Sequence, residues 1–445
     1  MTSVVLIGNT VFSPGAASPV FAPGAVRVDS GTITHVGDPG DVPREGAEVI
    51  EDRGVVLVPG LANAHTHLYS TLARGMPFPG GPPASFREIL ERVWWKWDKI
   101  LDLDAVEMNA RAGLIEAARS GVTAVNDHHA GPRSIAGSLD RIAGAAEETG
   151  VRVALAYEVS DRDGPEVRDR GLEENERFAE RLEKAPSPRL ASTTGAHASF
   201  TLSDETLGRL AVLAEKTGRP VHIHMDEGPE DGEDARARGE RSTTTRLAKR
   251  GVLRRGAMVA HAVHIDGEDR ADLSRLGVFV SHNPLSNGGN AVGRADVPAM
   301  LRAGVDVGLG TDGMAGGLAG DAAAAGAAHR MAGGDRSIPF DLPARLVFGG
   351  SARLASRLFG ETFGVLAPGA AGDVAAVRYG PPTPIDETNG AAHWQLGVLH
   401  APVEHLVVAG RIVLREGRFP DLSEEEILGR ARETARRLWK EMNRP

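Results

Sequence analysis

Two histidines one residue apart follow an apolar run, and this pattern limits what the chain can fold into. The segment reads VVLVPGLANAHTHL and covers residues 55–68. An apolar run of this kind indicates a buried strand of a parallel sheet. If the strand extends to its end, His65 and His67 point to the same side, because side chains alternate along a strand. Two neutral imidazoles on one side form half of a divalent-metal site.

The alternative is that both histidines lie in a loop and are unrelated, and the rest of the chain argues against it. Further apolar segments follow, and between them lie segments whose apolar residues recur at helical spacing. Strands that alternate with helices in this way predict an α/β fold, a (β/α)8 TIM barrel over residues 57–365. The predicted strands are residues 55–68, 122–129, 151–159, 189–197, 220–227, 257–265, 278–284 and 305–313.

Short strands broken by Gly, Pro and Asp stand on both sides of the predicted barrel. Residues 1–56 and 366–420 both show this pattern of short strands, and neither segment alone can bury a hydrophobic core. We therefore expect the two segments to pair into one small β-sandwich. A helix is predicted to close the chain at residues 421–445.

Charge and composition exclude several classes of protein. The formal net charge of −10 argues against nucleic acid and against a membrane surface as partners. The chain has no cysteine, so a metal ion must be held by His, Asp or Glu. The first residues, MTSVVLIGNT, do not read as a signal peptide, and no apolar run reaches transmembrane length. We therefore expect a cytoplasmic protein.

Polar side chains stand at the ends of most predicted strands, where barrel enzymes place their catalytic groups. In VHIHMDE, His222 and His224 share a face, and His224 lies nearer the mouth, so it is the third predicted imidazole ligand. Asp312, near the end of the last predicted strand, supplies an oxygen ligand or a base. With His65 and His67 this set leaves room for a water, whose pKa a divalent cation would lower toward 7. One such ion is expected, zinc ahead of iron, although the ligand set suits both.

Two further residues carry predicted roles in catalysis. Glu227 lies three residues after His224 and is placed to protonate a ring nitrogen or a leaving amine. His261 could hold the attacking hydroxide or polarise the substrate, and a buried structural histidine is the alternative. The predicted strand at 189–197 has no lysine, which argues against a second metal bridged by a carboxylated lysine.

Several motifs along the chain belong together. They are PGLANAHTHL, GAHASF, HIHMDE, VAHAVH, SHNPLSN and GTDG. In this set the chain resembles the amidohydrolase superfamily, in its mononuclear, metal-dependent aminohydrolase branch. The stretches HLYSTLARG, WWKWDKILD, NDHHAGP and YGPPTPIDETNGAAHW are similar to those of SsnA-type aminohydrolases.

The resemblance implies roles for individual residues. Zinc or iron would be bound by His65, His67, His224 and Asp312. Glu227 and Asp312 would move protons, and His261 would orient the nucleophile. A homodimer or a larger homo-oligomer is also a family expectation.

Substrate contacts are predicted at four further positions. His197 is similar to a substrate-contacting histidine of this branch, although Ala196 stands where the family usually has proline. For His128 and His129 two interpretations are open: the residues line the wall of a cavity, or they have a structural role. Trp94 lies three residues before Trp97, so both could face one side of a helix. Core or dimer contact is one interpretation of this cluster, and an aromatic wall for a flat substrate is the other.

The sequence thus predicts a hydrolytic deaminase that acts on an amino-substituted heteroaromatic ring of the purine, pyrimidine or triazine type. Metal hydroxide would attack the carbon that bears the amino group, and ammonia would leave after protonation by Glu227. Chloride displacement or cyclic C–N hydrolysis at the same site remains an alternative. A non-catalytic homologue that binds metal or ligand is another, and the retained Glu227 argues against it.

Overall fold

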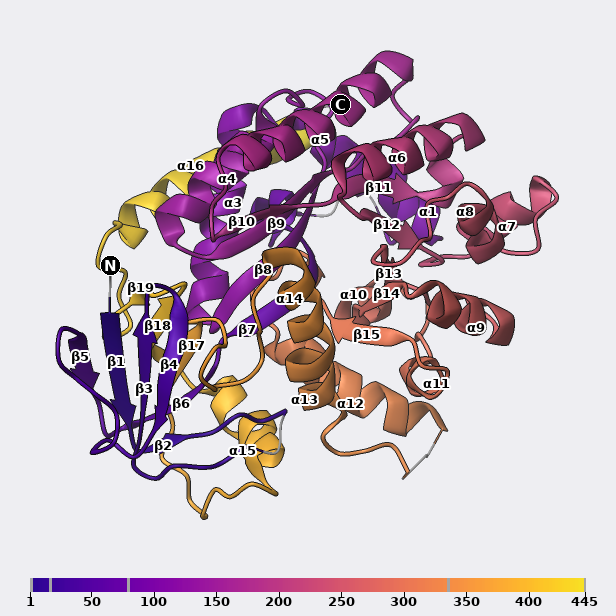
Figure 1. The fold of residues 1–445 in the computed structure, drawn as a ribbon. Helices are drawn as coiled ribbons and strands as arrows, with labels where there is room; N and C mark the ends of the chain where they lie inside the picture. Colours follow the sequence, from indigo (N-terminus) through magenta and orange to yellow (C-terminus); the bar gives the residue numbers. More distant parts are fainter. Residues whose placement is uncertain (1–2, 16–17, 78–80, 334–336, 444–445) are drawn as a thin grey trace.

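The computed structural model describes residues 3–15, 18–77, 81–333 and 337–443. Parallel strands alternate with helices over most of the chain, so the fold is α/β as predicted (Figure 1). One parallel sheet has the order β10-β9-β8-β7-β16, with β7 (Leu61–His67), β8 (Val122–His129), β9 (Arg152–Tyr157), β10 (Leu190–Ser192) and β16 (Asp312–Gly313). A second has the order β11-β12-β13-β14-β15, with β11 (Thr194–Ala198), β12 (Val221–Met225), β13 (Met258–His261), β14 (Phe279–His282) and β15 (Asp306–Leu309).

The two parallel sheets meet at both of their edges. An isolated parallel bridge joins Val159, after β9, to Ala196 in β11. At the other edge the chain runs from β15 through Gly310 into β16, and the Thr311 amide donates to the His65 carbonyl at 3.0 Å. A Cβ atom on Gly310 would lie 2.7 Å from that same carbonyl oxygen, so the close approach requires glycine. The carboxyl end of β7 is thereby held beside Asp312.

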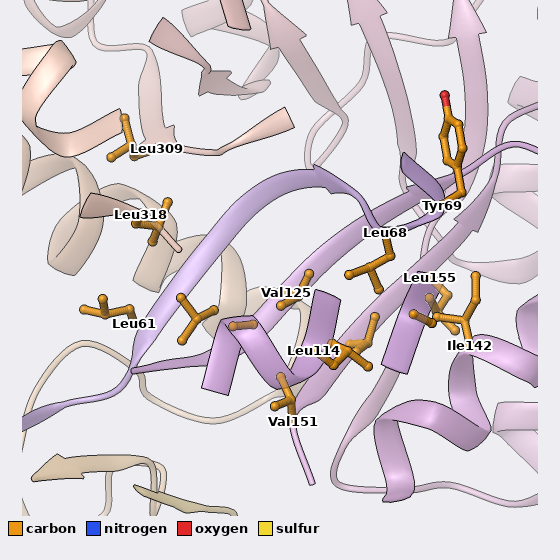
Figure 2. Packing of buried hydrophobic residues seen from close by; sticks show 14 of the residues in the cluster. Leu61, Leu68, Tyr69, Leu114, Val125, Ile142, Val151, Leu155, Leu309 and Leu318 are labelled. Carbon is orange, nitrogen blue, oxygen red and sulfur yellow. The ribbon is translucent and has the colours of Figure 1, made fainter. Parts of the chain in front are cut away.

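Helices pack against the outer sides of these strands. Leu114 of α3 and Ile142 of α4 lie beside Val125 of β8 and Leu155 of β9, and Figure 2 shows part of this apolar cluster. None of the helices in the described residues is long and apolar enough to cross a membrane. The longer helices are α3 (Leu103–Arg119), α4 (Ser138–Thr149), α5 (Pro165–Lys184), α6 (Asp204–Thr217), α7 (Glu230–Ala237), α9 (Gly267–Leu276), α12 (Ala319–Gly333), α14 (Ala352–Phe359) and α16 (Glu424–Met442).

Shorter helical segments connect the larger elements, and some of them line the cavity described below. They are η1 (Leu68–Ala73), α1 (Phe86–Ile89), η2 (Leu90–Trp94), α2 (Trp95–Ile100), η3 (Ser199–Thr201), α8 (Thr243–Lys249), α10 (Pro284–Gly289), α11 (Val297–Arg302), α13 (Leu342–Ala344), η4 (Arg345–Ser351), α15 (Gly390–Leu396) and η5 (Val398–His400).

The two ends of the chain meet in a separate set of strands. One sheet has the order β4-β3-β1-β5, with β1 (Ser3–Gly8), β3 (Gly24–Asp29), β4 (Thr32–Gly37) and β5 (Glu48–Glu51). The other has the order β19-β18-β17-β6-β2, with β2 (Thr10–Val11), β6 (Val55–Pro59), β17 (Val374–Arg378), β18 (Val403–Val408) and β19 (Arg411–Leu414). Antiparallel pairing of β6 with β17 joins the two ends, which lie side by side in Figure 1. The domain boundaries themselves stay a prediction.

Four predicted strands differ from the structure. The strand expected at 305–313 is divided between β15 and β16, which belong to different sheets. The strand expected at residues 55–68 is wrong, because the chain leaves one sheet and enters another at Gly60, whose amide donates to the Asp373 carbonyl at 3.0 Å. The strand expected at 257–265 ends at His261, because His261 and Ala262 take positive φ angles of 77° and 48°. The strand expected at 189–197 is divided at Thr193 between β10 and β11.

Arg152 ties the parallel strands to the terminal strands. Its side chain is fully buried on β9, and its Nη2 lies 3.0 Å from Oδ1 of Asp373, the residue before β17. Its Nη1 lies 2.7 Å from Oε1 of Glu361. Removing the arginine would leave the Asp373 carboxylate buried without its partner, which is costly.

We therefore predict that Arg152→Met lowers the free energy of unfolding by about 3–5 kcal/mol. Urea denaturation followed by circular dichroism measures this change. Arg378→Met is the matched control, because Arg378 is 44% exposed in its ion pair with Asp52 and should cost less than about 1 kcal/mol. Equal losses in the two variants would contradict the assignment of Arg152 as a buried tie.

Candidate active site

The four predicted ligands come together at the carboxyl ends of the parallel strands. The Nε2 atoms of His65 and His67 lie 3.2 and 3.0 Å from Oδ1 of Asp312. This geometry follows from the pairing of β16 with β7, which aligns Asp312 with Thr66. From β12, His224 places its Nε2 3.0 Å from Nε2 of His67. Three imidazoles and one carboxylate thus converge on one point.

Hydrogen bonds at the far side of each ring fix which nitrogen faces this point. Nδ1 of His67 donates to the His128 carbonyl at 2.6 Å, and Nδ1 of His224 donates to the His197 carbonyl at 2.8 Å. Nδ1 of His65 lies 2.8 Å from Nε2 of His222, which accords with the predicted deeper, hydrogen-bonded place of His222. Nδ1 of His67 and Nδ1 of His224 therefore carry a proton, and Nε2 is the nitrogen that each ring directs at this point.

The electrostatics of the cluster favour positive charge at its centre. Burial opposes ionisation of Asp312, but hydrogen bonds from His65 and His67 outweigh it and hold the pKa of this carboxyl well below its usual range. Burial lowers the pKa of His65 to about 3. Burial also disfavours a charged His67, but Asp312 overcomes it and raises the pKa of His67 to about 9. A cation at this point is stabilised by the same carboxylate.

Side chains within the described residues offer donor atoms at metal-binding separations. One group is His65, His224, His261 and Asp312, and an overlapping group is His67, His128, Glu158 and His224, each with atoms within 4.8 Å of one another. The imidazole and carboxylate donors suit a divalent ion such as zinc or iron, and the rings described above direct Nε2 toward it. The residues therefore fit the divalent metal that the sequence predicts.

Glu227 and His261 face each other beside this cluster. Oε2 of Glu227 lies 3.4 Å from Nε2 of His261, and Nδ1 of His261 donates to Oδ1 of Asn287 at 2.8 Å. Burial raises the pKa of Glu227 to about 7, although the charge of His261 opposes the shift. A carboxyl group with this pKa can both accept and release a proton near neutral pH.

Helix α10 contributes polar residues that sequence reasoning missed. Asn290 donates from Nδ2 to Oε1 of Glu227 at 3.0 Å and to the Ser286 hydroxyl at 3.4 Å. The Ser286 hydroxyl in turn donates to Oδ2 of Asp312. The motif SHNPLSN supplies Ser286 and precedes Asn290, and only the fold reveals that both reach the two carboxylates.

Backbone strain marks the ends of three strands. Asp226, His261 and Asp312 are not glycine, and they have positive φ angles of 50°, 77° and 62°. Such conformations cost of order 1–3 kcal/mol each and persist only where the surroundings enforce them. The turn at Asp226 directs Glu227 toward the cluster, and the turns at His261 and Asp312 occur within it.

A cavity of about 690 Å³ opens above the cluster. This volume falls in the range of small-molecule sites and holds one heterocycle with a substituent. Apolar side chains from the segment after β7 line one wall, among them Phe86, Leu90 and Trp95. His67, His224, Glu227 and Asp312 line the floor.

The predicted substrate contacts divide into two pairs. His197 and Trp94 line the cavity, as a substrate contact requires. His128 and His129 are fully buried and are not among the lining residues. The two tryptophans also differ from each other. Trp97, unlike Trp94, is buried and donates from Nε1 to the Tyr69 carbonyl at 2.9 Å. Direct contact with substrate stays a prediction for all four.

The acidic residues of the cavity that were not predicted are Asp98, Glu158, Asp231 and Asp321. Glu158 follows β9 and lines the cavity, and its position after an apolar strand was the available signal. Asp98 lies on α2, lines the cavity and accepts from Nη2 of Arg162 at 2.8 Å. Nothing in the sequence pattern places Asp98 here, because its position depends on how the segment after β7 folds.

Comparison with known proteins identifies the family of the chain. The chain belongs to the amidohydrolase family, whose family model matches residues 56–413. A 5-methylthioadenosine/S-adenosylhomocysteine deaminase of Desulforudis audaxviator is 32% identical over 442 residues, which cover 98% of this chain and 99% of the relative. The predicted resemblance to the amidohydrolase superfamily is therefore confirmed.

Solved structures share the fold. An adenosine deaminase from Xanthomonas campestris with bound zinc has a TM-score of 0.84 and 21% identity, and the match covers 99% of both chains. An atrazine chlorohydrolase from Arthrobacter aurescens in complex with zinc has a TM-score of 0.80 and 22% identity, with 97% of this chain and 100% of the other covered. At these identities the similarity concerns the fold.

We predict that His224→Asn weakens zinc binding by at least about 100-fold, because loss of a ligand costs more than the 10–100-fold typical of an outer hydrogen-bond partner. Competition against a chromogenic chelator measures the affinity, and elemental analysis gives the stoichiometry. His264→Asn is the control, because His264 is exposed beyond the end of β13. Unchanged affinity in His224→Asn would exclude His224 as a ligand.

Proposed function

We propose that the chain is a metal-dependent aminohydrolase that releases ammonia from an amino-substituted nitrogen heterocycle of the purine, pyrimidine or triazine type. One observation carries the proposal: Glu227, whose pKa burial raises to about 7, lies beside His261 and the cluster of three imidazoles and one carboxylate at the floor of the cavity. The relative from Desulforudis audaxviator is itself named a deaminase, which supports the reaction class. Its name also makes adenine-type rings a first choice for testing.

Each ligand has a defined part in this proposal. His65, His67, His224 and Asp312 would hold one divalent ion, zinc ahead of iron. When bound, the ion supplies Lewis acidity and lowers the pKa of a water molecule at its open position. Nδ1 of each of His67 and His224 is held by a backbone carbonyl, so both rings are oriented before the ion arrives.

Glu227 is proposed to move protons between the attacking water and the leaving amine. Its carboxyl group is close to half-ionised at neutral pH, so it can accept one proton and then deliver it to the leaving nitrogen. Asn290 donates to Oε1 of Glu227, which leaves Oε2 directed at His261 and the reaction centre. With its Nδ1 proton held by Asn287, His261 offers Nε2 as an acceptor that orients the attacking water.

The cavity suits a flat ring. Phe86, Trp94 and Trp95 supply apolar and aromatic surface, against which a heterocycle can stack. His197 lines the cavity beside Trp95, with ring centroids 6.2 Å apart, and offers a polar contact. We propose that Trp94 and His197 contact the substrate. We propose that His128 and His129 lie behind the cavity wall and support it.

Further features belong to this proposal. We propose that the two parallel sheets are the halves of one eight-stranded barrel, supported by the bridge between Val159 and Ala196 and by the Thr311 to His65 hydrogen bond. We also propose that the terminal strands form a β-sandwich, with residues 1–56 and 366–420 as one composite domain. A homodimer or larger assembly and a cytoplasmic location complete the proposal.

The experiment is a panel of amino-heterocycles given to zinc-loaded protein, with release of ammonia as the readout. We predict turnover of at least one ring class and a loss of about 10²–10⁴-fold in kcat for Glu227→Gln, the usual contribution of a positioned acid–base group. Glu205→Gln is the matched control, because Glu205 is exposed on α6.

Two outcomes would contradict the proposal. Chloride release from chlorinated rings without ammonia release from any amino ring would indicate another leaving group. Equal turnover in Glu227→Gln and the wild type would remove Glu227 from the proton path. Elemental analysis of each variant keeps a loss of metal distinct from a loss of proton transfer.

A further inference from the structure

A buried carboxylate stands on the cavity wall away from the proposed proton path. Glu158 follows β9, lines the cavity and is 5% exposed. Its Oε2 lies 3.3 Å from Nδ1 of His128, and its Oε1 lies 3.6 Å from Nε2 of His197. Both carboxylate oxygens of Glu158 therefore face imidazole nitrogens on the wall of the substrate cavity.

The hydrogen bonds of His197 determine what it presents to the cavity. Nδ1 of His197 lies 2.8 Å from the Thr201 hydroxyl oxygen, and that hydroxyl donates its hydrogen to the Ala198 carbonyl at 3.0 Å. The hydroxyl oxygen must therefore accept from the Nδ1 proton of His197. In the neutral ring the proton is therefore on Nδ1, and Nε2, which faces Oε1 of Glu158, carries a lone pair.

Two hydrogen-bond acceptors therefore lie side by side on the cavity wall. Oε1 of Glu158 and Nε2 of His197 are 3.6 Å apart, and neither carries a hydrogen for the other. A buried acceptor without a donor is unfavourable, so a ligand that brings donors gains affinity and a ligand that brings lone pairs loses it. Carboxylates prefer donors that come in parallel pairs.

We propose that Glu158 and His197 form an acceptor pair that selects heterocycles whose edge carries two adjacent N–H donors, and that excludes rings with a carboxylate or a lone pair at that edge. A ring N–H next to an exocyclic amino group is the donor edge meant here. The inference rests on the proposed function, because it assigns the specificity of the same cavity. His128 positions the pair, since its Nδ1 approaches the other oxygen of Glu158.

Glu158 also belongs to a group of side chains that could hold a metal ion. Glu158 and His128 form one possible donor group with His67 and His224. Those two rings already direct Nε2 toward the cluster around Asp312 and use Nδ1 for backbone carbonyls. They cannot serve two ions at once, so Glu158 is left to a ligand other than a second metal.

The experiment compares binding of matched ligands to zinc-loaded protein by calorimetry. Glu227→Gln is the background, because it blocks turnover during the measurement. The first pair is isocytosine, which has a ring N–H beside an amino group, and 4-pyrimidinone, which lacks the amino group. The second pair is uracil and orotate, which differ by a carboxylate.

We predict that isocytosine binds at least about 10-fold more tightly than 4-pyrimidinone, the discrimination expected of a paired donor–acceptor contact. Adding Glu158→Gln should reduce this ratio to about 2-fold or less and should improve binding of orotate relative to uracil, because the negative charge is gone. Glu166→Gln, exposed on α5, is the matched control and should leave both ratios unchanged.

The outcomes separate the inference from its alternatives. Equal weakening of all four ligands by Glu158→Gln, or a second zinc ion that is lost in this variant, would overturn the acceptor pair. Discrimination in binding without ammonia release from any ring would keep the acceptor pair and refute the deaminase proposal. Ammonia release without discrimination between the matched ligands would refute the acceptor pair and keep the deaminase proposal.

Discussion

The Asp312 carboxylate between two imidazoles is the interaction on which the rest of the site depends. Asp312 reaches His65 and His67 only because β16 pairs with β7, so residues 247 and 245 positions apart in the chain meet. Gly310 permits the approach, since any side chain there would meet the His65 backbone. The contact that holds the end of β15 against the first parallel strand is therefore also the contact that assembles the metal-binding cluster.

The same assembly carries strain and buried charge that the scaffold must hold in place. Asp226, His261 and Asp312 take backbone conformations that favour glycine, all at the site. Asp312 is buried as an anion and is stabilised by imidazole hydrogen bonds and by the Ser286 hydroxyl. The backbone strain and the buried charge each arise at single residues, whereas the contacts that offset them come from other strands and helices. The site is therefore only as stable as the packing of its strands.

The sequence predicted that these four side chains converge because their signals are local. His65, His67 and His224 follow apolar strands at a spacing of two, and Asp312 ends another such strand, so strand periodicity was sufficient. Glu158 gave the same signal and was missed, because one glutamate carries no motif. Asn290 and Asp98 gave no signal, since a loop and a helix decide where they lie. The break at Gly60 was missed because a continuous apolar run does not reveal which sheet its two halves enter.

Two glutamates of one cavity have opposite environments, and this difference divides their work. Burial raises the pKa of Glu227 to about 7, whereas Glu158 lies between the imidazoles of His128 and His197. A group that must exchange protons needs a pKa near the working pH, and a group that must accept hydrogen bonds is better permanently ionised. Both residues are glutamates after apolar strands in the sequence. The neighbours that the fold supplies, Asn290 and His261 for one and His128 and His197 for the other, make one suited to chemistry and the other to recognition.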